Sequence, residues 1–198
     1  MGKDTGLRIC AAALKLLDSS GDAAEVTMRR VAAEVGLAPM AIYKHFPSRD
    51  ALLKAATLTE YERIGGYFQR ANARRNIKKL RGMLGYLDYA LDHPNLFRYM
   101  FSSAREGAYV FPRDLNAGKS STMNILHEVV EDAMKSNRMR RDDVFEVSLT
   151  IWAHAHGLIA LYLVGRINLP RKQFRDLYLR SLNRLLDGLL APARPLGS

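Results

Sequence analysis

The amino-acid sequence predicts an all-α fold of about nine helices, with a small N-terminal domain at residues 1–50 and a larger domain at residues 51–198. Apolar side chains recur at intervals of three and four residues along most of the chain, as they do on one face of a helix. Stretches that alternate apolar and polar residues are scarce, and no two-residue hairpin turn separates β-branched runs. Because 48% of the 198 residues are hydrophobic, one or two domains with real cores are expected.

The N-terminal domain is predicted to begin with two helices. The first carries an apolar stripe and stops at Ser19–Gly21. The stripe consists of Leu7, Cys10, Ala11, Leu14 and Leu17. The Thr27 hydroxyl can accept a hydrogen bond from a backbone N–H of the next helix, which predicts a helix over residues 28–35 that Gly36 ends.

A third short helix and a longer fourth one follow. Pro39 suits the start of the third helix, because its missing N–H is no loss there, and Pro47 stops this helix after residue 46. The fourth runs from about residue 48 toward residue 68 and is loosened at the glycine pair 65–66. Further helices are predicted at about residues 83–91, 96–104 and 123–137, with a loop at 107–118.

The last two segments are the most apolar. Residues 144–166 are apolar on nearly every face and, at about 1.5 Å per residue, long enough to cross a bilayer. Glu146 and the central histidines would be costly in lipid, so a buried helix of a soluble oligomer is favoured over a membrane span. The final helix, residues 171–190, carries two apolar stripes, which predicts one contact with its own core and one with a second subunit.

The cysteine content and the net charge of the sequence indicate the cellular compartment and the kind of partner. The only cysteine, Cys10, cannot form an intramolecular disulfide, and no charged segment leads into an apolar one at the start, so a cytoplasmic protein is expected. The net charge of +10 favours an anionic partner, although charge alone does not choose between nucleic acid and a membrane surface. A basic run, most simply a solvated face, holds Lys54, Arg63, Arg70, Arg74, Arg75, Lys78, Lys79 and Arg81.

Residues 28–46 have the outline of a helix-turn-helix, with two short helices meeting at a tight turn around Gly36. Apolar residues one helical turn apart give each helix an inward edge, which leaves polar residues of the third helix exposed. Lys44 can reach phosphate or guanine, and Tyr43 can donate its hydroxyl to phosphate. Met40 and Ala41 can touch a thymine methyl group.

Flanking residues can hold the DNA backbone. Thr27 and Arg29 lie at the start of the second helix, and Arg49 lies at the positive end of the fourth. The predicted DNA contacts are Thr27, Met28, Arg29, Pro39, Met40, Ala41, Tyr43, Lys44, His45 and Arg49. The competing interpretation is an ordinary three-helix corner whose polar side is merely hydrated.

Other function classes find little support in the residues. No nucleophile, base and orienting group can be assembled, so an enzyme is not expected. His154 and His156 lie about 200° apart around a helix and make a poor metal pair, so neither a metal nor a cofactor is predicted. A basic RNA-binding or membrane-surface protein remains an alternative, although the basic run lacks interleaved aromatic residues.

The run TMRRVAAEVGLAPMAIYKHFPSRDALLKA resembles the DNA-binding domain of the tetracycline-repressor (TetR) family of bacterial transcription regulators. It matches at Thr27, Val31, Ala32, Gly36, Tyr43, His45, Phe46, Arg49, Leu52 and Leu53. Carried over to this sequence, the resemblance implies DNA contacts by Thr27, Pro39, Met40, Tyr43, Lys44, His45 and Arg49. Ala38 departs from the family, which often caps the recognition helix here with Ser or Thr, and Pro39 partly compensates.

The C-terminal half is similar to the family in its length and succession of helices. Trp152, His156 and Gly157 match the W-x-x-x-H-G signature of a TetR-family C-terminal domain sometimes called the WHG domain. Trp152 and His156 are four residues apart on one helical face, so packing is favoured over ligand contact as their role. Gly157 would let a neighbouring helix approach closely.

The resemblance implies a homodimer whose last two helices, about 144–166 and 171–190, pair with their mates as a four-helix bundle. The recognition helices would then enter successive major grooves of a palindromic operator in double-stranded DNA, about 34–36 Å apart. A small-molecule effector would shift the helix beginning near Ser48 and release the DNA. Repression is the usual mode in this family, and activation is the alternative.

The regulatory core would bind an apolar effector through aromatic and methionine side chains of the middle helices. The same side chains are equally suited to packing. The predicted ligand-binding residues are Tyr61, Tyr67, Met83, Tyr86, Leu87, Tyr99, Met100, Phe101, Met123, Leu126, His127, Trp152 and His156.

Overall fold

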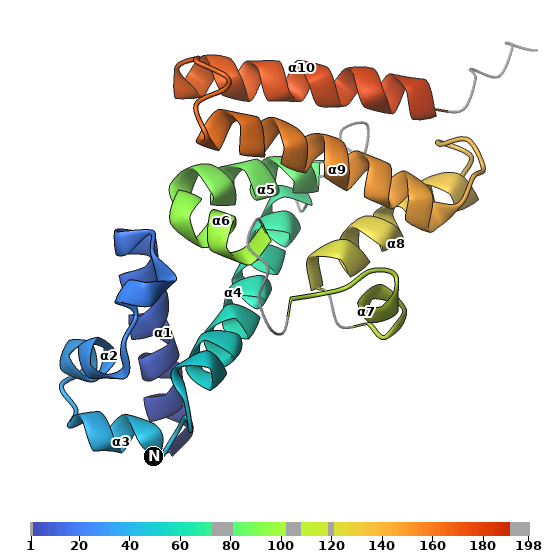
Figure 1. Ribbon diagram of the computed structural model, residues 1–198. Helices are drawn as coiled ribbons and strands as arrows, with labels where there is room; N and C mark the ends of the chain where they lie inside the picture. Colours follow the sequence, from blue (N-terminus) through green and yellow to red (C-terminus); the bar gives the residue numbers. More distant parts are fainter. Residues whose placement is uncertain (1, 73–80, 102–107, 119–120, 191–198) are drawn as a thin grey trace, which may run out of the picture. The chain divides into compact units, whose positions relative to one another are not determined.

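The computed structural model describes residues 2–72, 81–101, 108–118 and 121–190, and within these ranges every regular element is a helix (Figure 1). The α-helices are α1 (Gly2–Ser20), α2 (Met28–Val35), α3 (Pro39–Tyr43), α4 (Arg49–Asn72), α5 (Arg81–Asp92), α6 (Pro94–Phe101), α7 (Arg113–Asn116), α8 (Ser121–Lys135), α9 (Val144–Leu163) and α10 (Arg171–Leu189). One turn of 3₁₀ helix, η1 (Ala23–Glu25), precedes α2. The all-α prediction is therefore confirmed.

The chain forms two compact units. Unit 1 holds Met1–Ile64 and Tyr89–Tyr109, and unit 2 holds Gly65–Asp88 and Val110–Ser198. Helices α4 and α5 each contribute residues to both units. Unit 1 includes α6 as well as the N-terminal helices, because α1 packs against α6 and against α2.

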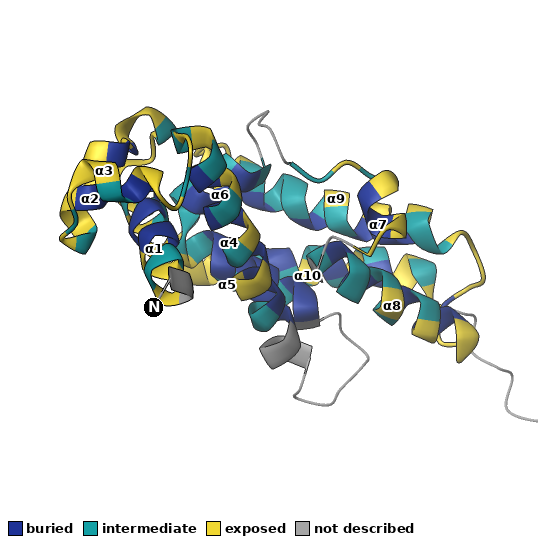
Figure 2. Cartoon of the chain, turned by 90° about the horizontal axis from the view of Figure 1, so that it is seen from below, coloured by how far each residue is buried: buried dark blue, intermediate teal, exposed yellow. Residues whose placement is uncertain are grey.

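The core of unit 1 contains part of the predicted stripe of α1, because Cys10 and Leu17 are buried, and it also contains α1 residues that the prediction left out. Ile9, Ala13 and Leu17 are fully or almost fully buried, whereas Leu7 is 58% exposed and Ala11 is exposed. Helix α1 has apolar residues on more than one side, so the periodicity fits two stripes. The contacts with α2 and α6 select the stripe on which Ile9, Ala13 and Leu17 lie one turn apart, and Figure 2 shows the alternation of buried and exposed positions along α1.

The C-terminal end of α1 is joined to the start of α6 by polar contacts. His93 Nδ1 lies 2.7 Å from Asp18 Oδ2, and the Asn95 side-chain amide donates to the Asp18 carbonyl at 2.6 Å. Gly21 follows at φ +72, where a Cβ would lie 3.0 Å from Asn95 Oδ1. The left-handed backbone therefore favours glycine, and a Cβ would also press against the Asn95 side chain.

A buried carboxylate lies between α4 and α5 in unit 1. Glu60 is 2% exposed and accepts hydrogen bonds from Tyr89 Oη at 2.7 Å and from Arg63 Nε at 2.8 Å. Burial and the neighbouring Glu60 raise the pKa of Tyr89, so its hydroxyl stays a donor. Burial alone would lower the pKa of Arg63, but its hydrogen bond and charge interaction with Glu60 raise it overall. Glu60 therefore depends on both partners for its place in the core.

Unit 2 is built around α5. Gly85 of α5 meets the backbone of α4 so closely that a Cβ would lie 2.5 Å from the Tyr67 carbonyl oxygen. On α10, the buried Tyr178 hydroxyl donates to the Met83 carbonyl at 2.9 Å, and Arg175 pairs with Asp88. Helix α9 packs against both α8 and α10.

Most predicted helices form, with three differences at their ends and connections. Helix α4 runs unbroken through the glycine pair 65–66, and α3 ends at Tyr43 rather than at residue 46. The predicted loop at 107–118 contains the four-residue helix α7, which the buried Asp114 steadies by accepting a hydrogen bond from Val110 N at 2.8 Å.

Helix α9 is the one helix in the described part of the chain that is long and apolar enough to cross a membrane. A single such helix is weak evidence for a span, because core helices of soluble proteins have the same length and composition. One face of α9 is buried within unit 2, at Val147, Ser148, Ile151, Ala155 and Ile159.

Candidate nucleic-acid interface

The predicted helix-turn-helix forms in unit 1 from α2 and α3. Thr27 Oγ1 accepts a hydrogen bond from Arg30 N at 3.2 Å and caps α2, as predicted. Gly36 ends α2 in the left-handed conformation, with φ 70 and ψ 34, and Leu37 N then bonds back to the Ala32 carbonyl at 2.9 Å. This closing pattern turns the chain sharply into α3.

Helix α3 is anchored on one side and exposed on the other. Ile42 is fully buried and Ala41 is half-buried, while Met40 is 72% and Tyr43 48% exposed. Pro39, Lys44 and His45 are also exposed. The N-cap residue Ala38 makes no side-chain cap bond and Pro39 occupies the first turn, in line with the predicted departure at this position. The side chains predicted to contact DNA from this helix are therefore all accessible except for part of Ala41.

Met28 is a correction to the predicted contacts. Its side chain is only 8% exposed and belongs to the core, because the first turn of α2 directs it inward beside Val31. Only the backbone of Met28, at the start of α2, is available to a phosphate. Thr27 and Arg29 on either side are exposed.

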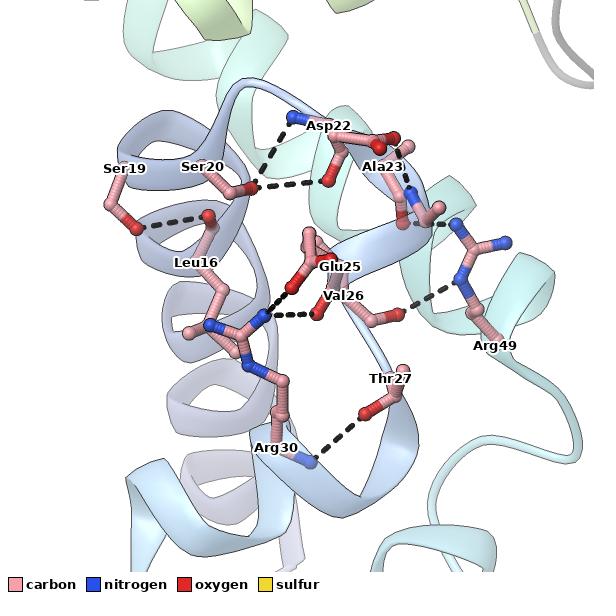
Figure 3. A network of polar contacts seen from close by, with 11 residues as sticks. Leu16, Ser19, Ser20, Asp22, Ala23, Glu25, Val26, Thr27, Arg30 and Arg49 are labelled. Atoms are coloured by element: carbon pink, nitrogen blue, oxygen red, sulfur yellow. Dashed lines mark hydrogen bonds and ion pairs between the residues drawn. The ribbon is translucent and has the colours of Figure 1, made fainter.

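Arg49 has a structural role that the sequence did not reveal. Its Nε donates to the Val26 carbonyl at 2.9 Å, and its Nη2 donates to the Ala23 carbonyl (Figure 3). These bonds tie the start of α4 to the segment that leads into α2. Arg30, absent from the predicted set, holds the same segment from the other side, donating to the Glu25 carbonyl at 3.1 Å and pairing with the Glu25 carboxylate (Figure 3).

The predicted ligand-binding residues fall into both units. Four of them belong to unit 1, namely Tyr61, Tyr99, Met100 and Phe101. The centroid of the Tyr61 ring lies 5.9 Å from that of Phe101 and 4.5 Å from that of Tyr109. The other predicted ligand-binding residues belong to unit 2. Of these, Met83, Tyr86, Leu87, Met123 and Leu126 are buried core residues.

Three predicted residues of unit 2 meet in one cluster. Trp152 Nε1 donates to Tyr86 Oη at 3.3 Å, and Tyr86 Oη lies 3.1 Å from His156 Nδ1. Burial lowers the pKa of His156, so the ring is neutral near neutral pH. Its Nδ1 can therefore accept a hydrogen bond from the Tyr86 hydroxyl. The hydroxyl therefore joins Trp152 and His156 of α9 to α5, in agreement with the packing role favoured for these residues.

The basic run has little described structure. Arg74, Arg75, Lys78 and Lys79 lie outside the described residues, and the side chains of Arg70 and Arg81 do as well. Arg63 is bound to Glu60. Among the described residues, no group of three or more His, Cys, Asp or Glu side chains could hold a metal ion.

A helix-turn-helix whose second helix keeps an exposed polar face, within a described fold made of helices, is typical of DNA-binding regulators. Residues 9–56 match the family described as bacterial regulatory proteins, tetR family, and residues 80–189 match the tetracyclin repressor-like C-terminal domain. The chain belongs to the TetR family of DNA-binding transcriptional regulators, which is a non-enzymatic family. The WHG-type signature stays a prediction from sequence.

The chain is also similar to curated relatives in sequence and to solved structures in fold. The chain is 27% identical to the nucleoid occlusion factor SlmA of Sodalis glossinidius over 154 residues, 73% of either chain. It is 29% identical to SlmA of Serratia proteamaculans over 168 residues, 78% of this chain and 81% of that protein. A Rhodococcus sp. RHA1 protein of unknown function has the same fold, with a TM-score of 0.74, 22% identity and coverage of 93% of this chain and 94% of that one.

Proposed function

We propose that the protein is a ligand-responsive repressor that binds a palindromic operator as a homodimer and is released by a small, mainly apolar effector. The observation that carries the proposal is the exposed side of α3, where Met40, Tyr43 and Lys44 face solvent while Ile42 anchors the helix. Such a combination of apolar, hydroxyl and cationic groups suits base edges and phosphates of the major groove.

The last two helices supply the proposed dimer interface. Each has a face committed to the core of unit 2, with Ile151 and Ile159 buried on α9 and Phe174 and Tyr178 buried on α10. Apolar side chains nevertheless remain exposed on or just beyond these helices, at Leu149, Leu161, Val164 and Leu190. Burying such residues against a second copy would remove them from water and give the four-helix bundle implied by the family.

Leu161→Glu is expected to weaken the dimer, because Leu161 is 47% exposed on α9 and a carboxylate there would lose its hydration at the interface. The dimer dissociation constant should rise at least about tenfold, which corresponds to about 1.4 kcal/mol. Light scattering over a dilution series measures the change. Glu146→Gln, at an exposed position of the same helix, is the matched control, and a dimer unaffected by Leu161→Glu would place the interface elsewhere.

The effector response is proposed to act through α4. This helix begins at Arg49, which is bonded to the segment before α2, and continues into unit 2. A ligand that favours a shifted position of α4 would move the helix-turn-helix and change the spacing of the two recognition helices. Useful release requires that the ligand favour the non-binding state by a few kcal/mol.

The proposal is tested by selecting genomic DNA fragments with the purified protein and titrating the best fragment against salt and a scrambled control. We expect a palindrome with at least about 10³-fold preference over nonspecific DNA. Its position relative to the promoter, followed by transcription in vitro, separates repression from activation. Equal affinity for RNA, or binding that hardly depends on salt, would instead favour the basic RNA-binding or membrane-surface alternative.

A further inference from the structure

Two buried polar atoms of α8 have no hydrogen-bond partner among the described residues. They are Asn124 Oδ1 and His127 Nδ1. An unpaired buried polar atom lowers the stability of the fold by roughly 1–3 kcal/mol. Two such atoms on one helix are therefore unusual and need an explanation. Because they are three positions apart, both side chains lie on the same face of α8.

The positions of these two residues along the α8–α9 hairpin predict that they lie toward the aromatic cluster of α9. Helices α8 and α9 pack against each other and run in opposite directions on either side of their connection (Figure 1). His127 lies eight residues before the end of α8 at Lys135, and Trp152 lies eight residues after the start of α9 at Val144. Equal helical rise on both sides therefore predicts that His127 lies at about the same level as Trp152.

The surroundings at this level are aromatic. The Trp152 ring meets Phe111 edge-on at 6.1 Å and His156 at 5.4 Å, and all three residues are only half-buried. Partly covered rings of this kind favour contact with another flat apolar group. Burial lowers the pKa of His156 and so keeps this ring neutral.

We infer that Asn124 and His127 are polar anchors for the effector, and that they recognise a hydroxyl group carried on an aromatic ring, such as a phenol. The inference rests on the proposed ligand response. Asn124 Oδ1 can only accept, whereas His127 Nδ1 donates when it carries the proton. A single hydroxyl donates to the first and accepts from the second, so one ligand atom satisfies both, while its ring contacts Trp152.

Substitution of the anchors tests the inference first without any ligand. Asn124→Leu and His127→Leu are each expected to raise the urea midpoint of the ligand-free protein, because each removes an unpaired polar atom. Glu128→Gln, at an exposed position of the same helix, should leave the midpoint unchanged. A lowered midpoint in both leucine variants would show that water or an undescribed residue already satisfies these atoms, and would overturn the inference.

Binding is then measured by the fluorescence of Trp152, the only tryptophan of the chain. We expect 4-propylphenol to change this emission, and 4-propylanisole, in which a methyl group replaces the hydroxyl proton, to bind at least about tenfold more weakly. Asn124→Leu should abolish that preference, and Glu128→Gln should retain it. Equal binding of the two compounds to the wild-type protein, or a preference that survives both leucine substitutions, would overturn the inference.

Operator binding in the presence of 4-propylphenol separates this inference from the proposed function. If 4-propylphenol binds through Asn124 and His127 but leaves operator affinity unchanged, the assignment of these two residues as a binding site is kept and the proposed release of DNA by a ligand at this site is rejected. If another compound releases the operator equally well from wild type, Asn124→Leu and His127→Leu, the ligand response stands and the anchor assignment fails.

Discussion

Alanine at both Tyr43 and Lys44 is expected to weaken operator binding by at least about 10²-fold. Each base or phosphate contact of this kind is worth about 1–3 kcal/mol, and a homodimer loses it in both half-sites. Both side chains are exposed, while the packing of α3 rests on Ile42, so the fold and the dimer should be unaffected. Loss of Lys44 should also reduce the salt dependence of binding, because fewer counterions are released from the DNA.

Titration of the selected operator with wild-type and variant protein measures this effect. Lys15→Ala is the control, because it removes an exposed lysine of α1 whose surface ion pair with Glu34 of α2 is expected to contribute little to stability. Light scattering and circular dichroism report whether the variant is still a folded dimer. Unchanged operator affinity, or loss of the dimer in the double variant, would mean that these residues are wrongly assigned.

Arg63→Met is expected to destabilise the protein by about 2–3 kcal/mol. The substitution leaves the buried Glu60 carboxylate with Tyr89 as its remaining described donor. Breaking a fully buried pair costs about 3–5 kcal/mol. The loss here is smaller because the Arg63 side chain is 41% exposed and water can replace part of the interaction. Urea denaturation of the two proteins measures the difference.

A second substitution tests the reason for this loss. Glu60→Gln in the Arg63→Met background removes the buried charge and keeps an oxygen that can accept from Tyr89. We expect the double variant to be more stable than Arg63→Met alone, which is the coupling expected of a charge pair. A double variant that is less stable than Arg63→Met would show that the unpaired Glu60 charge is not the cause of the loss.

Helix positions were largely predictable from the sequence, because their limits are set by local chemistry. Thr27 caps α2, Gly36 ends it in the left-handed conformation, and Pro39 occupies the first turn of α3, all as predicted. The periodicity of apolar residues did not determine which face of a helix is buried, because that depends on tertiary contacts. The choice of Ile9 over Leu7 for the core of α1 depends on where α2 and α6 pack, and nothing local to α1 encodes it.

The candidate site was predictable to the extent that exposure follows from helix geometry. The exposed side of α3 emerged correctly, because five residues make little more than one turn around the buried Ile42. Met28 was misassigned because the first position of a helix can face either way until the rest of the domain is present. Bonds from Arg49 to carbonyls more than twenty residues away leave no signal in a single sequence.

Cys10 can serve as a chemical probe of the opening of unit 1. The thiol is 4% exposed on the core side of α1, and burial raises its pKa, so a thiol reagent reaches a reactive thiolate only when α1 separates from its neighbours. As the only cysteine, it makes the labelling rate of the unmodified protein a direct measure of how often this unit opens. A labelling rate that falls when the operator is added would show that bound DNA reduces the opening of unit 1.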